Sequence, residues 1–200
     1  DAHFFASHAG IVYNADGVPE GIALKVNHSS RSVPVRISGT VGKQHAYPAL
    51  AAIALGVTEG INFISAAQWV EEWYKPPAGR LRIISGMRES IMLDDTYNAS
   101  PSAVQAALAA LEDVKGKRKI AVLGDMMELG RHSVEEHHKV GETVAEAADI
   151  FFAVGPRMKA AAEKARALGM RDVETFSDSR VAADALRAIL KAGDVVLVKG

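Results

Sequence analysis

The sequence predicts an α/β protein in which residues 79–200 form a Rossmann-like, doubly wound and mostly parallel sheet. Three observations indicate this fold. Continuous apolar runs such as Ile150–Val154 are typical of strands buried on both faces, segments with helical spacing separate them, and Pro76–Gly79 divides this pattern from a different one upstream. Buried strands that alternate with helices indicate a parallel sheet covered on both faces.

Residues 1–78 are expected to form a partial domain that is rich in β-structure at first and helical afterwards. Short apolar runs in the first 40 residues are separated by turn-forming segments at Asn14–Gly17 and Asn27–Ser30, which is typical of antiparallel strands. From Gln44 onward the apolar residues follow helical spacing. A second helix is predicted over Ser65–Tyr74, with the Ser65 side chain as its N-terminal cap.

The elements expected in residues 79–200 alternate between strands and helices after an initial pair of strands. In chain order they are strands 81–85 and 90–94, a helix from Pro101, strand 120–123, a helix from Ser133, strand 150–154, a helix from Pro156, strand 173–176, a helix that ends at Gly193 and strand 195–198. Ser100 before Pro101, and Ser133 three residues before Glu136, are typical helix-start signals.

The composition excludes several classes of function. A net charge of −1 provides no basic field for nucleic acid or anionic lipid, and the absence of cysteine excludes disulfides and thiol chemistry. The longest nearly apolar run, Ala46–Val57, is too short to span a bilayer. We therefore expect a cytoplasmic protein that binds no nucleic acid and inserts into no membrane. Because the chain begins with Asp1 and stops directly after a strand-like run, we also expect it to be a piece of a longer polypeptide.

Two acidic loops, Asp94–Pro101 and Gly124–Gly130, each follow a predicted strand and precede a predicted helix. Ligands of open α/β sheets bind at the carboxyl ends of strands, so these loops are the candidate site. For the first loop a site and a helix cap are equally good interpretations, since a capping Asp or Ser contributes about 1 kcal/mol by itself. The second loop is longer than the roughly two to six residues of an ordinary strand-to-helix connection.

Other motifs carry less weight. Gly39–Gln44 resembles the end of a phosphate-binding P-loop, but Ile37 stands at the place of the first glycine and Gln44 at that of the magnesium-binding Ser or Thr. A glycine fingerprint for a dinucleotide is absent, which counts against an oxidoreductase. His137 lies on a predicted buried helical stripe and is expected to be a core or supporting histidine, and no spacing indicates a metal site.

Several segments together carry a resemblance to a known family. They are Asp94–Pro101, Ala121–Gly130, Ser133–Gly141 with His137, and Leu197–Gly200, accompanied upstream by Gly42–His45 and Pro77–Arg80. In order and spacing these segments resemble those of the Mur ligases, most closely of the members that join D-alanyl-D-alanine to UDP-N-acetylmuramoyl-tripeptide. The resemblance covers essentially the whole chain.

The resemblance implies a protein of three domains. Residues 1–78 would be the C-terminal part of the central ATPase domain, without its P-loop, and residues 79–200 would be the C-terminal domain, without its final helix. Pro76–Gly79 would be the hinge between them. The magnesium ligands would lie upstream of Asp1, and this piece alone would be inactive.

The implied activity is ATP-dependent amide bond formation in peptidoglycan precursor synthesis, by a monomer with ATP and Mg²⁺ as cofactors. ATP would phosphorylate the tripeptide carboxylate, and the amine of D-alanyl-D-alanine would attack the acyl phosphate. The resemblance assigns no catalytic residue and no metal ligand within this chain. Another ligase of the same superfamily, of the diaminopimelate-adding or folylpolyglutamate type, and a non-catalytic binding domain with the same fold remain alternatives.

The resemblance also implies roles for single residues. Those expected at the nucleotide are Arg80, Asp95 and His45, and those expected on the acceptor substrate side are Tyr97, Asn98, Asp125, Glu128 and Lys199. The sequence departs from the family at two places. Pro48 stands where an asparagine usually contacts the nucleotide, and Ser100 replaces the more usual asparagine of the first acidic loop.

Overall fold

The computed structural model describes residues 4–200, which divide into two compact units. Unit 1 is Asp1–Pro77 and unit 2 is Ala78–Gly200, so the division falls within the predicted Pro/Gly boundary segment. Within the described residues, every helix is too short or too polar to cross a membrane. That unit 1 is part of an ATPase domain stays a prediction.

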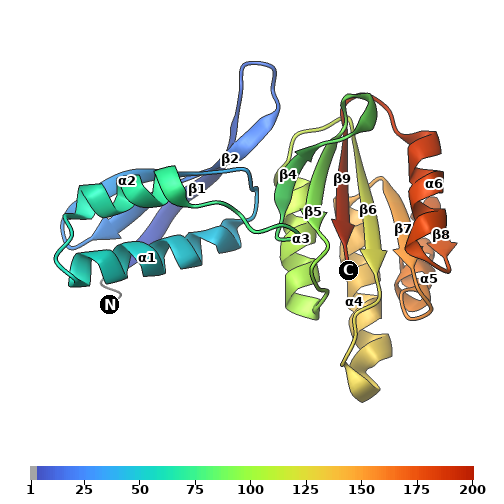
Figure 1. The fold of residues 1–200 in the computed structure, drawn as a ribbon. Helices are drawn as coiled ribbons and strands as arrows, with labels where there is room; N and C mark the ends of the chain where they lie inside the picture. The colour runs from blue at the N-terminus through green and yellow to red at the C-terminus, as the bar shows by residue number, and fades with distance from the viewer. Residues whose placement is uncertain (1–3) are drawn as a thin grey trace. The chain divides into compact units, whose positions relative to one another are not determined.

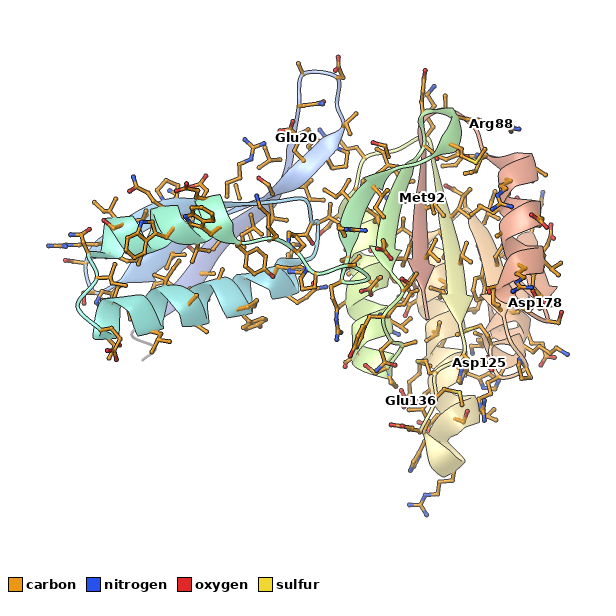
Figure 2. All side chains as sticks on the ribbon, viewed as in Figure 1. Glu20, Arg88, Met92, Asp125, Glu136 and Asp178 are labelled. Carbon is orange, nitrogen blue, oxygen red and sulfur yellow. The ribbon has the colours of Figure 1, made fainter. Side chains whose placement is uncertain are left out.

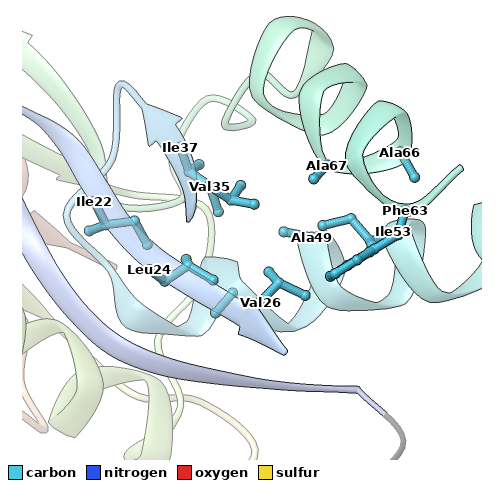
Figure 3. Close-up of a cluster of buried hydrophobic side chains, with 11 residues drawn as sticks. Ile22, Leu24, Val26, Val35, Ile37, Ala49, Ile53, Phe63, Ala66 and Ala67 are labelled. Carbon is cyan, nitrogen blue, oxygen red and sulfur yellow. The ribbon is translucent and has the colours of Figure 1, made fainter. Parts of the chain in front are cut away.

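Unit 1 is a three-stranded antiparallel sheet that packs against two helices (Figure 1). Its elements are β1 (Phe4–Tyr13), β2 (Pro19–His28), β3 (Arg31–Ser38), the 3₁₀ helix η1 (Lys43–His45), α1 (Ala46–Thr58) and α2 (Phe63–Trp73). Alternate residues of β2, namely Ile22, Leu24 and Val26, point into one core with Ile53 of α1 and Phe63 of α2 (Figure 3). This alternation is what an antiparallel sheet with one covered face requires.

β1 is one strand of 10 residues, with a register shift between Ser7 and Gly10. One local prediction for unit 1 was wrong. The second helix starts at Phe63 and not after Ser65, because the Asn62 side chain accepts a hydrogen bond from the Ile64 amide and caps the first turn.

Unit 2 contains a six-stranded sheet with the order β4-β5-β9-β6-β7-β8. Its elements are β4 (Arg82–Ser85), η2 (Met87–Glu89), β5 (Ile91–Asp95), α3 (Pro101–Asp113), β6 (Arg118–Gly124), η3 (Gly130–His132), α4 (Ser133–Ala147), β7 (Ile150–Val154), α5 (Lys159–Ala167), β8 (Asp172–Phe176), α6 (Ser179–Ile189) and β9 (Asp194–Lys199). Only β4 is antiparallel to its neighbour, so the predicted mostly parallel α/β sheet is confirmed.

The helices of unit 2 cover both faces of this sheet (Figure 1). The strands β5, β6, β7 and β8 step in one direction across the sheet, whereas the connection from β8 to β9 returns. Because such crossovers are right-handed, α3, α4 and α5 lie on one face and α6 on the other. On the α6 side, Leu186 and Leu190 pack against Ile120, Phe152 and Val196.

The strand order reverses at β9, which lies between β5 and β6 although it is last in the chain. The parallel strands all end at one side of the sheet, here called the carboxyl end. Asp95, Gly124, Val154 and Lys199 are the last residues of β5, β6, β7 and β9. Both acidic loops start there, so the topology places them beside the reversal point, where ligands of such sheets bind.

Candidate functional site

A pocket of about 560 Å³ opens at the carboxyl end of the unit 2 sheet. It is lined by Thr96, Val122, Gly124, Asp125, Val154, Gly155, Ser179, Val198, Lys199 and Gly200. Both predicted acidic loops contribute, the first through Thr96 and the second through Gly124 and Asp125. The start of α6 contributes Ser179. Both loops therefore border one pocket, and its use as a binding site stays a prediction.

Asp125 ties the second acidic loop to the turn that follows β7. Its Oδ1 accepts hydrogen bonds from the backbone amides of Arg157 at 3.0 Å and Met158 at 2.8 Å. The Arg157 guanidinium lies 3.6 Å from its Oδ2, and the Asp125 side chain is 14% exposed. The carboxylate therefore supports the turn before α5 while facing the pocket, and Figure 2 shows it at the carboxyl end, opposite Arg88.

Gly155 makes this approach possible. A Cβ atom at this position would lie 2.6 Å from the carboxylate carbon of Asp125, and its φ of 102° is one that residues with a side chain rarely adopt. The turn after β7 therefore needs glycine for both reasons.

His137 of α4 forms a hydrogen bond with the backbone of the second acidic loop. Its ring is fully buried, its Nε2 accepts a hydrogen bond of 3.2 Å from the Met126 amide, and its Nδ1 lies 2.7 Å from the Ser133 carbonyl oxygen. Since a carbonyl only accepts, Nδ1 carries the proton and the ring is neutral. The prediction of a core, supporting histidine is confirmed.

Glu128 lies in the same loop but does not line the pocket. It is exposed and has a φ of 61°, a left-handed conformation that is uncommon for a residue with a side chain. Its neighbour Met127 is 56% exposed and accepts a contact of 3.2 Å from the Arg157 guanidinium at its sulfur. A substrate contact by Glu128 stays a prediction.

Asp94 stabilises the start of the first acidic loop by accepting hydrogen bonds. Its carboxylate accepts hydrogen bonds from the Thr96 hydroxyl at 2.7 Å and the Gly79 amide at 3.0 Å, and the Arg82 guanidinium lies 3.6 Å away. Burial alone raises the pKa of Asp94, but the hydrogen bonds from Thr96 and Gly79 and the charge of Arg82 outweigh it and hold the pKa below its usual value.

Asp95 and Lys199 form a buried ion pair between the ends of β5 and β9. Their N···O distance is 2.5 Å, and the two side chains are 10% and 2% exposed. The Asp95 carboxylate also accepts a hydrogen bond from the Leu81 amide at 3.1 Å, and the Lys199 ammonium donates one of 2.8 Å to the Asn98 carbonyl. Direct contacts of Asp95 with nucleotide and of Lys199 with substrate stay predictions.

Tyr97 and Arg80 lie on the surface above this pair. The Arg80 guanidinium carbon is 4.0 Å from the centroid of the Tyr97 ring, a cation–π geometry, and the Tyr97 residue is 69% exposed. Asn98 is exposed, and its side-chain oxygen accepts a hydrogen bond of 2.8 Å from the Ala99 amide. The structure therefore brings together five predicted residues, namely Arg80, Asp95, Tyr97, Asn98 and Lys199.

His45 belongs to unit 1. The residue is 6% exposed, and its Nδ1 lies 2.7 Å from the hydroxyl of Tyr74, whose pKa is raised by burial. The predicted contact of His45 with adenine stays a prediction. Among residues 4–200, no three His, Asp or Glu side chains are grouped in the way that a metal ion requires.

Sequence reasoning missed the contribution of the loop after β7. Gly155 lines the pocket, and Arg157 is the cation beside Asp125. The available signal was the same as for the acidic loops, a Gly-Pro-Arg segment directly after a buried strand. Pro156 was instead interpreted as the start of a helix, which in the structure begins at Lys159.

Comparison with known proteins gives one consistent result. The family model of the Mur ligase, glutamate ligase domain, matches residues 79–200. The UDP-N-acetylmuramoyl-tripeptide–D-alanyl-D-alanine ligase of Treponema pallidum is 31% identical over 201 residues, which cover 95% of this chain and 42% of that protein. The corresponding ligase of Synechocystis is 33% identical over 171 residues, or 84% of this chain and 36% of the relative.

Solved structures agree. MurF from Acinetobacter baumannii aligns with a TM-score of 0.80 and 27% identity, over 99% of this chain and 42% of that structure. The fold of MurF from Thermotoga maritima, solved in complex with ADP, matches with a TM-score of 0.78 at 24% identity, over 99% of this chain and 43% of that one. This chain thus spans less than half the length of the relatives it matches. The matched motifs, the fold and the family model together establish that the chain belongs to the Mur ligase family.

Proposed function

We propose that this chain is part of an ATP-dependent ligase that joins D-alanyl-D-alanine to UDP-N-acetylmuramoyl-tripeptide. The observation that carries the proposal is the meeting of both acidic loops, Asp94–Pro101 and Gly124–Gly130, at one pocket. The curated relatives with this name support it, although the chain matches only 42% of the Treponema pallidum enzyme. The activity, the substrates and the cofactors therefore belong to the proposal.

The proposed reaction has two steps. ATP transfers its terminal phosphoryl group to the tripeptide carboxylate, and the amine of D-alanyl-D-alanine then attacks the acyl phosphate and expels phosphate. The protein contributes by holding the partners in line and by balancing the phosphoryl charge. Both steps need the reactants to meet in a site from which water is kept away.

Unit 2 supplies the acceptor side in this proposal. Val122, Val154 and Val198 give the pocket apolar surface that suits the methyl groups of an alanyl dipeptide. Asp125 gives it a carboxylate that attracts the ammonium group of the dipeptide, and Thr96 and Ser179 give it hydroxyl groups. The volume of about 560 Å³ leaves room for a molecule of this size.

The nucleotide side depends on Arg80 and, by the family resemblance, on residues outside the pocket. A guanidinium suits a phosphate because its planar fork donates paired hydrogen bonds. When bound, Mg²⁺ would neutralise phosphate charge, but residues 4–200 do not group three acidic or His side chains for it. We therefore assign the ion to no residue here. A monomer that acts in the cytoplasm, with residues 76–79 as hinge, belongs to the same proposal.

The test is phosphate release from ATP in the presence of UDP-N-acetylmuramoyl-tripeptide and D-alanyl-D-alanine. It is run with this chain and with a chimera in which the chain replaces its matching region of the Treponema pallidum ligase. We expect release by the chimera only, and only with both substrates. Arg80→Ala should abolish most of it, whereas Arg187→Ala, which removes a surface arginine paired with Asp184, should not. A folded chimera that releases no phosphate would favour a non-catalytic binding domain.

A further inference from the structure

The ion pair between Asp95 and Lys199 calls for an explanation other than stability. Both charged side chains are almost completely removed from water, at 10% and 2% exposure, and their N···O distance is 2.5 Å. Removing two charges from water is costly, and the attraction between them often fails to repay that cost. In other proteins, replacement of a buried ion pair by apolar residues is often neutral or stabilising. This pair is therefore expected to do something other than raise stability, such as fixing the position of neighbouring residues.

The other hydrogen bonds of the pair are made with the backbone next to two exposed residues, Arg80 and Tyr97. Asp95 accepts from the Leu81 amide at 3.1 Å, and Lys199 donates to the Asn98 carbonyl at 2.8 Å. Leu81 directly follows Arg80, and Asn98 directly follows Tyr97. The pair therefore holds each member of the Arg80–Tyr97 stack through the backbone of the next residue.

A second set of contacts holds the same two segments together on the other side of Arg80. The Gly79 amide donates to Asp94 at 3.0 Å, and the Tyr97 amide donates to the Gly79 carbonyl at 3.2 Å. A Cβ atom at Gly79 would lie 2.9 Å from the Tyr97 nitrogen, so this approach needs glycine. Leu81 has a φ of 49° although it carries a side chain, and such a conformation persists only where its surroundings impose it.

We infer that Asp95 and Lys199 are positioning residues that preset the Arg80–Tyr97 couple through the backbone of Leu81 and Asn98. The inference rests on the proposed function, in which Arg80 meets phosphate and Tyr97 lines the acceptor side. A guanidinium that is already ordered loses less conformational freedom when it binds its phosphate. The Arg80 side chain is thus already ordered against the Tyr97 ring before it binds phosphate, although it is exposed.

The test uses NMR on the chain itself, so it requires no catalysis. The variants are Lys199→Met and the double variant Asp95→Leu with Lys199→Met, which removes both charges together. Two readouts report on the couple, namely hydrogen exchange of the Leu81 amide and the ring-current shift that the Tyr97 ring imposes on the Arg80 side-chain protons. Lys119→Met is the matched control, because this lysine also donates to a backbone carbonyl, that of Glu112 at 2.5 Å, at the opposite end of β6.

In the double variant we expect a folded unit 2, about ten- to hundredfold faster exchange at Leu81, since its hydrogen bond to a charged group is lost, and disappearance of the Arg80 ring-current shift. Amides in the middle of β6 and the Lys119→Met control should show neither change. Retention of both signals in the double variant would overturn the inference. Failure of the double variant to fold would also overturn it, by showing that the pair is needed for the fold. Absence of phosphate release in the chimera would instead reject the proposed function and leave these local readouts unaffected.

Discussion

The two ends of the unit 2 sheet each contain a buried aspartate with a basic partner, and the two pairs differ in what they connect. At the amino end, Arg118 holds Asp194 through two bonds of 2.9 and 2.6 Å, and Asp194 also accepts from the Lys191 amide. Arg118 lies at the start of β6, 76 residues before Asp194, and Lys191 lies in the turn between α6 and β9. At the carboxyl end, Asp95 and Lys199 join segments 104 residues apart and lie beside the pocket.

Similar chemistry therefore serves a junction of secondary-structure elements at one end and a candidate site at the other. The amino-end pair joins the start of β6 to the start of β9, and the Arg118 guanidinium donates as well to the Ile189 carbonyl at the end of α6. It therefore stabilises the junction of a helix and a strand. The carboxyl-end pair orders two exposed residues, Arg80 and Tyr97, that make no contribution to the core.

Breaking the amino-end pair should give the largest loss of stability. Arg118→Met leaves the Asp194 carboxylate, whose side chain is 1% exposed, without its charged partner. Removal of one member of a buried pair costs about 3–5 kcal/mol. Urea unfolding at neutral pH measures this loss in the free energy of unfolding. A loss below about 1 kcal/mol would show that the pair contributes little to stability.

Gly155 offers a sharper comparison with a glycine outside the site. Gly155→Ala should cost about 3 kcal/mol, because it adds a clash with Asp125 to an unfavourable φ of 102°. Gly169→Ala is the control, since Gly169 has a φ of 95° but nothing within 4 Å of its Cβ position, and it should cost about 1 kcal/mol. Thermal unfolding of both variants measures the difference, and equal losses would show that the contact with Asp125 does not constrain the turn.

Acid should destabilise the protein through aspartates at both ends. In Asp194, burial raises the pKa, but the hydrogen bonds from Arg118 and Lys191 outweigh it, so its pKa, like that of Asp94, lies below the ordinary 3.8. Stability from a lowered pKa is complete above the unfolded value and is lost as pH falls through the folded pKa. The urea concentration at the unfolding midpoint should therefore decrease as the pH drops below about 4. Asp94→Asn should make this decrease smaller. If Asp94→Asn leaves the pH dependence of the urea midpoint unchanged, groups other than Asp94 cause that dependence.

The smallest expected effect distinguishes two helix starts. Asp178 caps α6 by accepting from the Arg180 and Val181 amides at 2.9 and 3.1 Å, so Asp178→Ala should cost about 1 kcal/mol. Ser100 occupies the same position before α3 without a side-chain hydrogen bond, and Ser100→Ala should cost only a few tenths. Urea unfolding of the two variants compares them directly, and a larger loss for Ser100→Ala would contradict this description of the caps.

The sequence predicted the unit 2 strands and both acidic loops because buried strands and long polar loops leave local patterns. It placed the N-cap of α3 correctly at Ser100 before Pro101, but not the cap of α4. Ser133 was expected to cap α4 with Glu136, but it is the first residue of the helix, preceded by the 3₁₀ helix Gly130–His132. Nor could it predict the pairing of Asp95 with Lys199. That pairing depends on the insertion of β9 between β5 and β6, which no local periodicity encodes.

The most direct test of the central claim is a titration of the isotope-labelled chain with D-alanyl-D-alanine, followed by amide NMR. We expect saturable shifts at the pocket residues Thr96, Gly124, Gly155 and Gly200, with weaker shifts for L-alanyl-L-alanine. If these amides stay unchanged up to the solubility limit of the dipeptide, or if the shifts lie on another surface, the carboxyl end of the sheet is not the acceptor site.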